Sequence, residues 1–212
     1  MITLHLHPLA SYCWKVLIGL YETETPFTPN VVDLSDDVQR SALKRLAPFG
    51  KFPVLCDGER TITESTTILE HLARFHPGRA ALIPSDPDVA DPVRAKDRFF
   101  DLYVHEPMQK IVDDRIRPAD EKDPLGVARA RATLAIAYDV LEPVMGTRPW
   151  AAGEPFTMAD CAAAPALYYA NEVAPLGPAH PAVAAYLARL KARPSFARVL
   201  LEAAPYFHMF PR

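Results

Sequence analysis

Apolar positions in the first third of the chain switch repeatedly between the spacing of a strand and that of a helix. Alternate residues from Ile2 to Leu6 are apolar, which predicts a strand over residues 2–7 with one buried face. Apolar residues recur at helical spacing after Ser11. The pattern continues with a strand at 27–33, a short polar helix at 36–46, two strands joined by a turn at Asp57-Gly58, and a helix starting near Ser65.

This order of elements, β-α-β-α-β-β-α, is typical of an α/β thioredoxin-like domain, in which one sheet carries helices on both faces. We place this domain at residues 1–78. The stretch from Pro77 to Pro92 contains Pro, Gly, Ser and Asp without periodicity, which indicates an interdomain linker. We assign residues 79–91 to that linker.

The remainder, residues 92–212, shows no strand pattern and predicts an all-α domain. Pro107 is expected to bend or interrupt its first helix. Thr157, followed three residues later by Asp160, indicates a capped helix start. The Ala-rich run after Cys161 lets that helix lie close to its neighbours in the middle of a bundle. Helices are predicted at 92–116, at 125–145, after Thr157, at 181–192 and at 194–204.

Composition narrows the class of protein. The chain has 212 residues, half of them apolar, and a net charge of −3 without a strong basic patch, which argues against nucleic acid as a partner. No apolar run approaches the ~20 residues of a membrane span, and the N-terminus lacks the basic start of a signal peptide. The three cysteines form no CxxC pair, which favours a reducing compartment. We therefore expect a soluble cytoplasmic protein that does not bind membranes.

Metal and phosphate sites are not expected from the sequence. The seven histidines contain no HxxxH spacing. His5 and His7 share a strand face, but two ligands do not complete a metal site. No Gly-rich phosphate loop occurs.

The stretch from Gly50 to Ser65, GKFPVLCDGERTITES, combines two features that suit a peptide ligand. If the bond between Phe52 and Pro53 is cis, the backbone of Phe52 can point outward and pair with an extended peptide. Ser65 at a helix start offers a hydroxyl and a backbone N–H to a carboxylate. Together these groups would hold a small acidic peptide.

Lys51-Phe52-Pro53 followed by Glu64-Ser65 resembles the glutathione-binding signature of the glutathione S-transferase superfamily. The helical half, with its capped, Ala-rich central helix, is also similar to the C-terminal domain of that family. The resemblance implies glutathione as co-substrate and a two-fold homodimer. It also implies that Ser65 binds the γ-glutamyl carboxylate, that Glu64 faces the α-ammonium, that Phe52 pairs with the cysteinyl backbone, and that Lys51, or else Arg40, meets the glycyl carboxylate.

Residues 8–16, PLASYCWKV, resemble the active-site start of serine-type members of the family, so the resemblance implies that Ser11 stabilises the glutathione thiolate. One hydroxyl is enough for this task. Lowering a thiol pKa by two units from about 8.5 requires about 2.7 kcal/mol, and one charge-assisted hydrogen bond supplies roughly 1.5–3 kcal/mol. The alternative is that Ser11 only caps the helix.

Cys13 and Tyr12 are the second and third candidates for contact with the sulfur. Cys13, close to a helix N-terminus, could have a lowered pKa and act in glutathionyl exchange. However, Ala10 stands where a thioredoxin-type motif has its first cysteine. Tyr12 could place its phenol near the sulfur, although tyrosine-type members carry that residue earlier, on the first strand.

The resemblance thus predicts a glutathione transferase whose bound sulfur attacks a hydrophobic electrophile, as in detoxification. The electrophile pocket should form between residues 9–12 and the first helix of the second half. Two alternatives stay open: a glutathione-dependent thiol–disulfide oxidoreductase that uses Cys13, and a non-catalytic interaction module with the same fold. The expected pocket walls are Leu9, Tyr103, His105, Met108 and Phe207.

Overall fold

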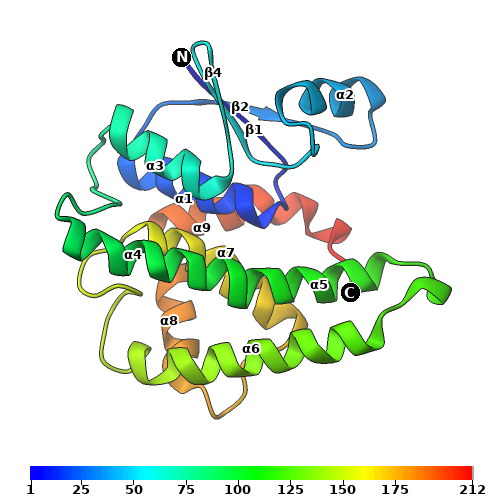
Figure 1. Cartoon of the computed structure of the whole chain (residues 1–212), viewed down its shortest axis with the longest axis vertical. Coiled ribbons are helices and arrows are strands. Elements are labelled where there is room, and N and C mark those ends of the chain that lie inside the picture. Colours follow the sequence, from blue (N-terminus) through cyan, green and yellow to red (C-terminus); the bar gives the residue numbers. More distant parts are fainter. Residues whose placement is uncertain (212) are drawn as a thin grey trace.

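The computed structural model describes residues 1–211, and its first part is an α/β domain built on a four-stranded sheet (Figure 1). The strand order is β2-β1-β3-β4, with β1 parallel to β2 and antiparallel to β3. The predicted order of elements is therefore confirmed. These elements are β1 (Ile2–Leu6), α1 (Ser11–Thr23), β2 (Thr28–Val31), α2 (Asp37–Leu46), β3 (Val54–Asp57), β4 (Arg60–Thr63) and α3 (Ser65–Phe75).

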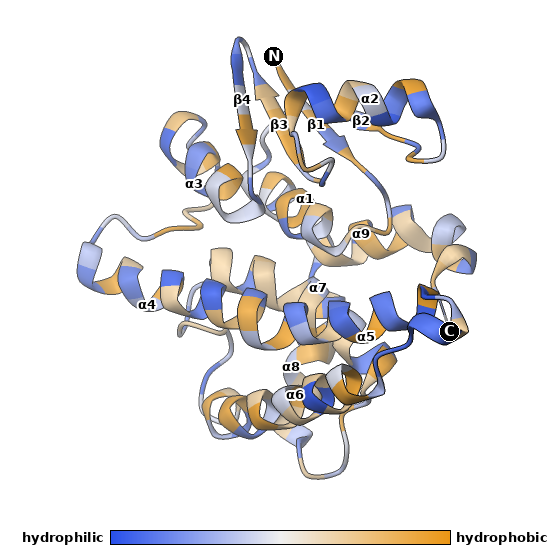
Figure 2. Ribbon diagram, turned by 45° about the vertical axis from the view of Figure 1, so that its right-hand side comes forward, coloured by the Kyte–Doolittle hydropathy of each residue, from blue (hydrophilic) through white to orange (hydrophobic). Residues whose placement is uncertain are grey.

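Helices cover both faces of this sheet. Leu4 of β1 lies at the face that carries α1 and α3, and it belongs to the main core of the molecule. Val54 of β3 faces the other side, where it packs with Leu43 of α2 in a small separate core. Figure 2 shows α2 on one side of the strands and α1 with α3 on the other. The alternation of apolar residues in β1 is thus explained by a sheet that is buried on its α1 side.

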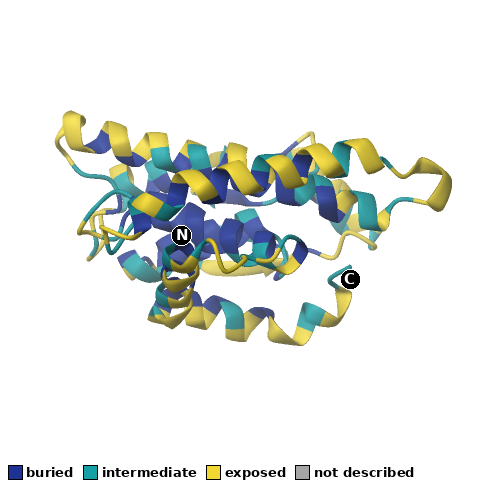
Figure 3. Cartoon of the chain, turned by 90° about the horizontal axis from the view of Figure 1, so that it is seen from below, coloured by how far each residue is buried: buried dark blue, intermediate teal, exposed yellow. Residues whose placement is uncertain are grey.

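The second part of the chain is helical and is organised around α7 (Met158–Val173), which is buried along most of its length. The predicted capping box is present, because the Asp160 carboxylate accepts the Thr157 N–H at 2.9 Å. The buried alanines at 162–164 let neighbouring helices approach α7 closely. Figure 3 shows the buried residues gathered inside this helical part. The other elements are α4 (Pro87–Phe99), η1 (Phe100–His105), α5 (Glu106–Ile116), η2 (Ala119–Glu121), α6 (Pro124–Met145), α8 (Pro181–Ala192), α9 (Pro194–Ala203) and η3 (Ala204–Met209).

The helix predicted at 92–116 differs from the observed one at its start. Helix α4 begins at Pro87, because Asp86 accepts the Asp88 N–H at 3.0 Å and a proline suits the first helical turn. Residues 87–91, which the sequence pattern assigned to the linker, are therefore helical.

The same helix is interrupted by a π-helical turn, η1, two residues before Pro107. Pro107 has no N–H to donate to the carbonyl of Tyr103, four residues earlier, and its ring would crowd that carbonyl in a regular helix. A wider turn relieves this conflict. The expected interruption is present, and it turns Val104 and His105 inward while Leu102 and Tyr103 face solvent.

Within residues 1–211, no helix is both long and apolar enough to cross a membrane.

Candidate functional site

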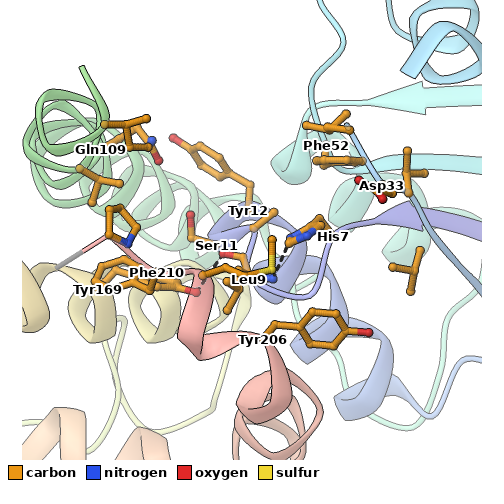
Figure 4. A pocket seen from close by; sticks show the side chains of 18 of the residues that line it. His7, Leu9, Ser11, Tyr12, Asp33, Phe52, Gln109, Tyr169, Tyr206 and Phe210 are labelled. Carbon is orange, nitrogen blue, oxygen red and sulfur yellow. Dashed lines mark hydrogen bonds between the residues drawn. The ribbon is translucent and has the colours of Figure 1, made fainter. Parts of the chain in front are cut away.

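An apolar cavity of about 870 Å³ lies between the two parts of the chain (Figure 4). The first part supplies the loop after β1, the segment after β2, and Phe52. The second part supplies one face of α5, Tyr169 of α7 and the C-terminal segment. Its lining includes Leu9, Ala10, Ser11, Tyr12, residues 31–35, Phe52, Met108, Val112, Ile116, Tyr169, Tyr206, Met209 and Phe210.

The loop between β1 and α1 is held in place from both sides. The Trp14 indole N–H donates to the carbonyl of Pro8 at 2.6 Å, and the Tyr169 hydroxyl donates to the carbonyl of Leu9 at 2.9 Å. Helix α1 then begins at Ser11 behind Ala10, which has no side-chain oxygen to cap it. The first N–H groups of a helix have no partner within the helix. The start of α1 therefore offers these N–H groups and the Ser11 hydroxyl beside the cavity.

The Ser11 hydroxyl contacts the Nε2 atom of His105 at the end of η1. His105 is 2% exposed, and burial lowers its pKa from 6.5 to about 3, with the positive charge of Lys15 acting in the same direction. The imidazole is therefore neutral near pH 7. Its Nδ1 atom has no hydrogen-bond partner among the described residues. The serine is thus held by a neutral side chain from the second part of the chain.

Tyr12 and Cys13 occupy opposite environments. Tyr12 lines the cavity, with its ring centroid 3.8 Å from that of His105, and burial raises the pKa of its hydroxyl. Cys13 is fully buried in the main core and does not line the cavity. Burial raises the pKa of the Cys13 thiol to about 12. The expectation of a lowered Cys13 pKa is therefore wrong, because desolvation outweighs the field of the helix N-terminus.

Phe52 and Pro53 are joined by a cis peptide bond, as the peptide-binding hypothesis requires. Phe52 lines the cavity and precedes Val54, the first residue of β3 that is paired in the sheet. Lys51 is exposed and lies outside the cavity lining. Arg40 donates to the Leu34 carbonyl at 2.7 Å and contacts Asp37. Of the two cations, Lys51 is the one without such local ties in the described chain.

Glu64 and Ser65 form the start of α3. Glu64 has φ 65° and ψ 119°, a backbone conformation that residues with a side chain rarely adopt. Its side chain does not cap the helix, so the first N–H groups of α3 remain available to a ligand. Ser65 is 6% exposed. Strained backbone of this kind concentrates at functional sites.

Buried charges tie the starts of α1 and α3 to the helix that carries His105. The Lys15 Nζ atom lies 2.7 Å from an Asp97 oxygen, 2.8 Å from an Asp101 oxygen and 2.8 Å from the Thr66 hydroxyl. Asp97 belongs to α4 and Asp101 to η1, whereas Thr66 is next to Ser65. Burial raises the pKa of Asp101 although Lys15 opposes that shift. These contacts fix the position of Ser11 relative to that of Ser65.

The cavity walls differ partly from those expected. Leu9 and Met108 line the cavity, as predicted. Tyr103 is 53% exposed and His105 is buried behind Ser11, so neither belongs to the lining. The expectation for these two residues was therefore wrong: Tyr103 faces solvent, and His105 contacts the Ser11 hydroxyl from behind. Phe207 packs against Trp14 and also lies outside the lining.

Several lining residues could not be selected from the sequence. Tyr206, Met209 and Phe210 belong to the C-terminal segment, whose path has no signal in its own pattern. Asp33 and Gln39 lie near the end of β2 and the start of α2, and they supply polar groups to one end of the cavity.

The family of this chain is decided by its match to known domains. Residues 4–80 match the profile described as "Glutathione S-transferase, N-terminal domain", and residues 100–194 match "Glutathione S-transferase, C-terminal domain". The chain belongs to the glutathione S-transferase family. The recognition made from the sequence motifs is thereby confirmed.

Relatives of known description align with nearly the whole length of this chain. A stringent starvation protein A homolog of Pasteurella multocida is 30% identical over 197 residues, which cover 92% of this chain and 87% of that protein. Glutathione S-transferase F6 of Arabidopsis thaliana is 29% identical over 202 residues, covering 92% of this chain and 96% of the relative. A crystal structure of a glutathione S-transferase from Methylobacterium radiotolerans, in complex with glutathione sulfonate, has a TM-score of 0.81 at 28% identity and covers 93% of each chain. These similarities support a function of the glutathione transferase type.

Proposed function

We propose that this chain is a glutathione transferase in which Ser11 stabilises the thiolate of bound glutathione. Domain 1–78 binds glutathione, residues 79–86 connect the domains, and the helical domain from residue 87 onward completes the pocket for a hydrophobic electrophile that the sulfur attacks. The observation that carries the proposal is the Ser11 hydroxyl, which lies at the start of α1 on the wall of the cavity between the domains. A hydroxyl and a helix N-terminus at one point both favour an anion there.

His105 sets the direction of the Ser11 hydroxyl in this proposal. A neutral imidazole carries one N–H, and Nδ1 is buried without a partner. Buried N–H groups without an acceptor are rarer than buried acceptors without a donor, which favours the N–H on Nε2. His105 then donates to the Ser11 oxygen, and the Ser11 O–H is free to donate to the sulfur. His105 is a positioning residue, and the Tyr12 hydroxyl is a second donor beside the same cavity.

The glutathione backbone is held by the residues of the sequence signature. The free N–H groups at the start of α3, with the Ser65 hydroxyl, receive the γ-glutamyl carboxylate, and Glu64 receives the α-ammonium. The cysteinyl backbone pairs with Phe52, which lies just ahead of the paired part of β3. Lys51 reaches the glycyl carboxylate. The unusual φ of Glu64 supports this assignment.

The electrophile occupies the apolar cavity. Met108 and Val112 of α5 face Leu9 and the C-terminal Phe210 across it, so the bound molecule is largely apolar. Asp33 and Gln39 allow one polar group at the far end. The volume of about 870 Å³ suits a molecule of the size of a small aromatic or branched compound.

The two alternative functions, a thiol–disulfide oxidoreductase and a non-catalytic interaction module, have different support. A thiol–disulfide oxidoreductase working through Cys13 would need that thiol to reach a disulfide, yet Cys13 is fully buried with a raised pKa. A non-catalytic module has one observation in its favour, the 30% identity to a protein described as a stringent starvation protein A homolog. The intact Glu64-Ser65 start of α3 favours a chain that binds glutathione.

Assembly and compartment belong to the same proposal. Phe49 is 89% exposed in the loop before β3, and Leu102 and Tyr103 are about half exposed on one turn of η1. Exposed apolar side chains of this size suit an interface between two copies of the chain. Cys13, Cys56 and Cys161 are free thiols, which suits a reducing compartment such as the cytoplasm.

Calorimetry with glutathione, followed by a conjugation assay with a panel of hydrophobic electrophiles, tests the proposal. The wild type is expected to bind glutathione and to conjugate at least one electrophile. Cys13→Ser should keep both properties, whereas Ser11→Ala should bind glutathione and lose most of the conjugation rate. Absence of glutathione binding in the wild type would contradict the proposal and favour the interaction module. A Cys13→Ser variant that loses disulfide exchange with glutathione while keeping conjugation would favour the oxidoreductase.

A further inference from the structure

Three side chains that the glutathione site does not use converge at the other end of α3. Asp57 ends β3, His71 lies on α3, and His76 follows its last residue. The Nε2 atoms of His71 and His76 lie 2.9 Å and 2.6 Å from the same Asp57 oxygen, Oδ2. Figure 1 shows α3 beside β4, the strand that follows Asp57. Two imidazoles and one carboxylate thus point at one place.

Among the described residues, the Asp57 carboxylate forms ion pairs only with these two histidine rings. Arg60 is directly opposite Asp57 in the sheet register, where an ion pair would be expected. Instead, its guanidinium lies over the Phe75 ring, 4.5 Å from the centroid, and no ion pair joins it to Asp57 in the described chain. The side chain of His71 is 8% exposed, whereas that of His76 is 31% exposed. The cluster is therefore enclosed on one side and open to water on the other.

These atoms are close to the arrangement of a metal site. One ligand atom from each of the three residues lies within 4.8 Å of the others. In a tetrahedral zinc site with Zn–N bonds of about 2.0–2.1 Å, ligand atoms are about 3.3 Å apart. The present distances of 2.9 Å and 2.6 Å from nitrogen to oxygen need to open by less than about 1 Å to admit the ion. Side-chain rotations suffice for that change.

We propose that Asp57, His71 and His76 bind a divalent transition-metal ion, with Zn²⁺ as the preferred metal. Imidazole nitrogens in two of the three positions favour zinc over calcium or magnesium, which prefer oxygen ligands. Each ring offers Nε2 to the ion once its proton resides on Nδ1. Water completes the fourth position on the open side, next to His76.

The ion would fix the end of α3 to the sheet. Without it, the two rings donate hydrogen bonds to Asp57, which is a weaker tie between the same elements. Helix α3 begins at the proposed γ-glutamyl site, but the metal cluster lies at its opposite end. The ion therefore acts on the stability of the first domain rather than on the reacting sulfur.

The sequence expectation of no metal site missed this cluster for a structural reason. His71 and His76 are five positions apart, and His76 comes within reach only because the helix ends at Phe75 and His76 adopts φ −133°, ψ 56°. The third ligand, Asp57, comes from a different element.

Zinc binding to the metal-free full chain tests this proposal. Protein treated with a chelator and then dialysed is titrated with Zn²⁺ in competition with a chromophoric chelator, and its melting temperature is recorded with and without zinc. The wild type is expected to bind one ion per chain with a dissociation constant in the micromolar range or below and to melt several degrees higher with zinc. Cobalt in place of zinc should give the visible absorption of a four-coordinate ion.

Matched variants separate a metal site from a simple hydrogen-bond tie. His76→Gln keeps a donor for Asp57 but removes the ligand, so it should match the metal-free wild type in melting temperature and lose at least about tenfold in zinc affinity. Asp57→Asn should lose affinity as well. His180→Ala is the control, because His180 contacts Asp139 at 2.8 Å in an isolated pair, and it should bind zinc as the wild type does. Equal zinc affinity in all four proteins, or no cobalt spectrum, would overturn the proposal.

Discussion

At the scale of single residues, the environment of a side chain decides its chemistry more than its position in a motif does. Ser11 and Cys13 are two positions apart at the start of α1. Ser11 lies on the cavity wall against a neutral imidazole, whereas Cys13 turns into the core and has a raised pKa. The sequence placed both at a helix start, but which of them faces the ligand depends on how α1 packs against the second domain.

The lowered pKa of buried His105 predicts that the protein loses stability in acid. Its pKa falls from 6.5 to about 3 on folding, so between these values the unfolded chain binds a proton that the folded chain does not. The free energy of unfolding is therefore unaffected by the titration of His105 above pH 6.5. It falls as pH falls below 6.5, by about 2 kcal/mol at pH 5. Denaturant unfolding at pH 7.5 and pH 5 measures this difference in the free energy of unfolding.

The variant His105→Gln isolates this contribution. Glutamine does not titrate and keeps an amide N–H that can donate to Ser11. Its free energy of unfolding should fall less between the two pH values than that of the wild type, by roughly the same 2 kcal/mol. An identical pH dependence in the two proteins would show that His105 is not the buried neutral group described here.

At the scale of elements, the start of α3 combines a strained backbone with a proposed binding role. Glu64 has a positive φ that costs about 1–3 kcal/mol for a residue with a side chain. Glycine adopts such a conformation without that cost but loses more chain entropy on folding, about 0.5–1 kcal/mol. The proposed contact of the Glu64 side chain with the α-ammonium of glutathione would account for the strain at this position.

Glu64→Gly should separate stability from glutathione binding. The free energy of unfolding is expected to stay equal or to rise by about 1 kcal/mol, because glycine relieves the strain. The dissociation constant for glutathione should rise about tenfold, because a charged hydrogen bond to the α-ammonium is lost. Thermal unfolding and calorimetry measure the two quantities.

Glu64→Gln is the companion variant, since it keeps the strained backbone and removes only the charge. It should lose affinity without gaining stability. Unchanged glutathione affinity in both variants would contradict the role proposed for Glu64.

Elements that are determined by residues close together in sequence were predictable, whereas those that depend on contacts with distant residues were not. Two such predictions are confirmed: the capping box at Thr157 and Asp160, and the turn at Asp57-Gly58. Each depends on residues only a few positions apart. Pro107 signalled an interruption, but its form as a π-helical turn depends on packing against α7. In this turn His105 is buried and Tyr103 is exposed, so neither residue lines the cavity as predicted.

At the scale of the whole molecule, a buried lysine links the two domains within their shared core. Lys15 is fully buried and meets Asp97 and Asp101 of the second domain as well as Thr66 of the first. Removing one partner of such a network leaves uncompensated charge in a place without water. The family resemblance predicted two domains, but this link between them has no local sequence signal, since its members are up to 86 positions apart.

Lys15→Met should lower the free energy of unfolding by about 3–5 kcal/mol, because Asp97 and Asp101 would lose their buried cation and keep only the half-exposed Arg98. Arg94→Ala provides the control: Arg94 of α4 pairs with Glu70 of α3 at 3.1 Å, also between the two domains, but in contact with solvent. Its loss should cost less than about 1 kcal/mol. Denaturant unfolding of the two variants measures both costs, and similar small values would contradict a stabilising role for the buried network.

The C-terminal segment shows the limit of sequence reasoning at this scale. Residues 206–211 contribute Tyr206, Met209, Phe210 and Pro211 to the cavity, although the segment itself is short and partly exposed. Its place is set by Trp14 and Tyr169, which pack against Phe207 and Phe210 and lie far from this segment in sequence. The size of the electrophile that fits is therefore a property of the folded chain.

The most direct measurement for the proposed function is the ultraviolet absorbance of the thiolate of bound glutathione as a function of pH. In the wild type the thiol should titrate about two units below its free value of about 8.5, and in Ser11→Ala the pKa should return toward that free value while glutathione still binds. A thiolate that titrates equally in the two proteins would contradict the role of Ser11 and move the chemistry to Tyr12 or to the N–H groups at the start of α1.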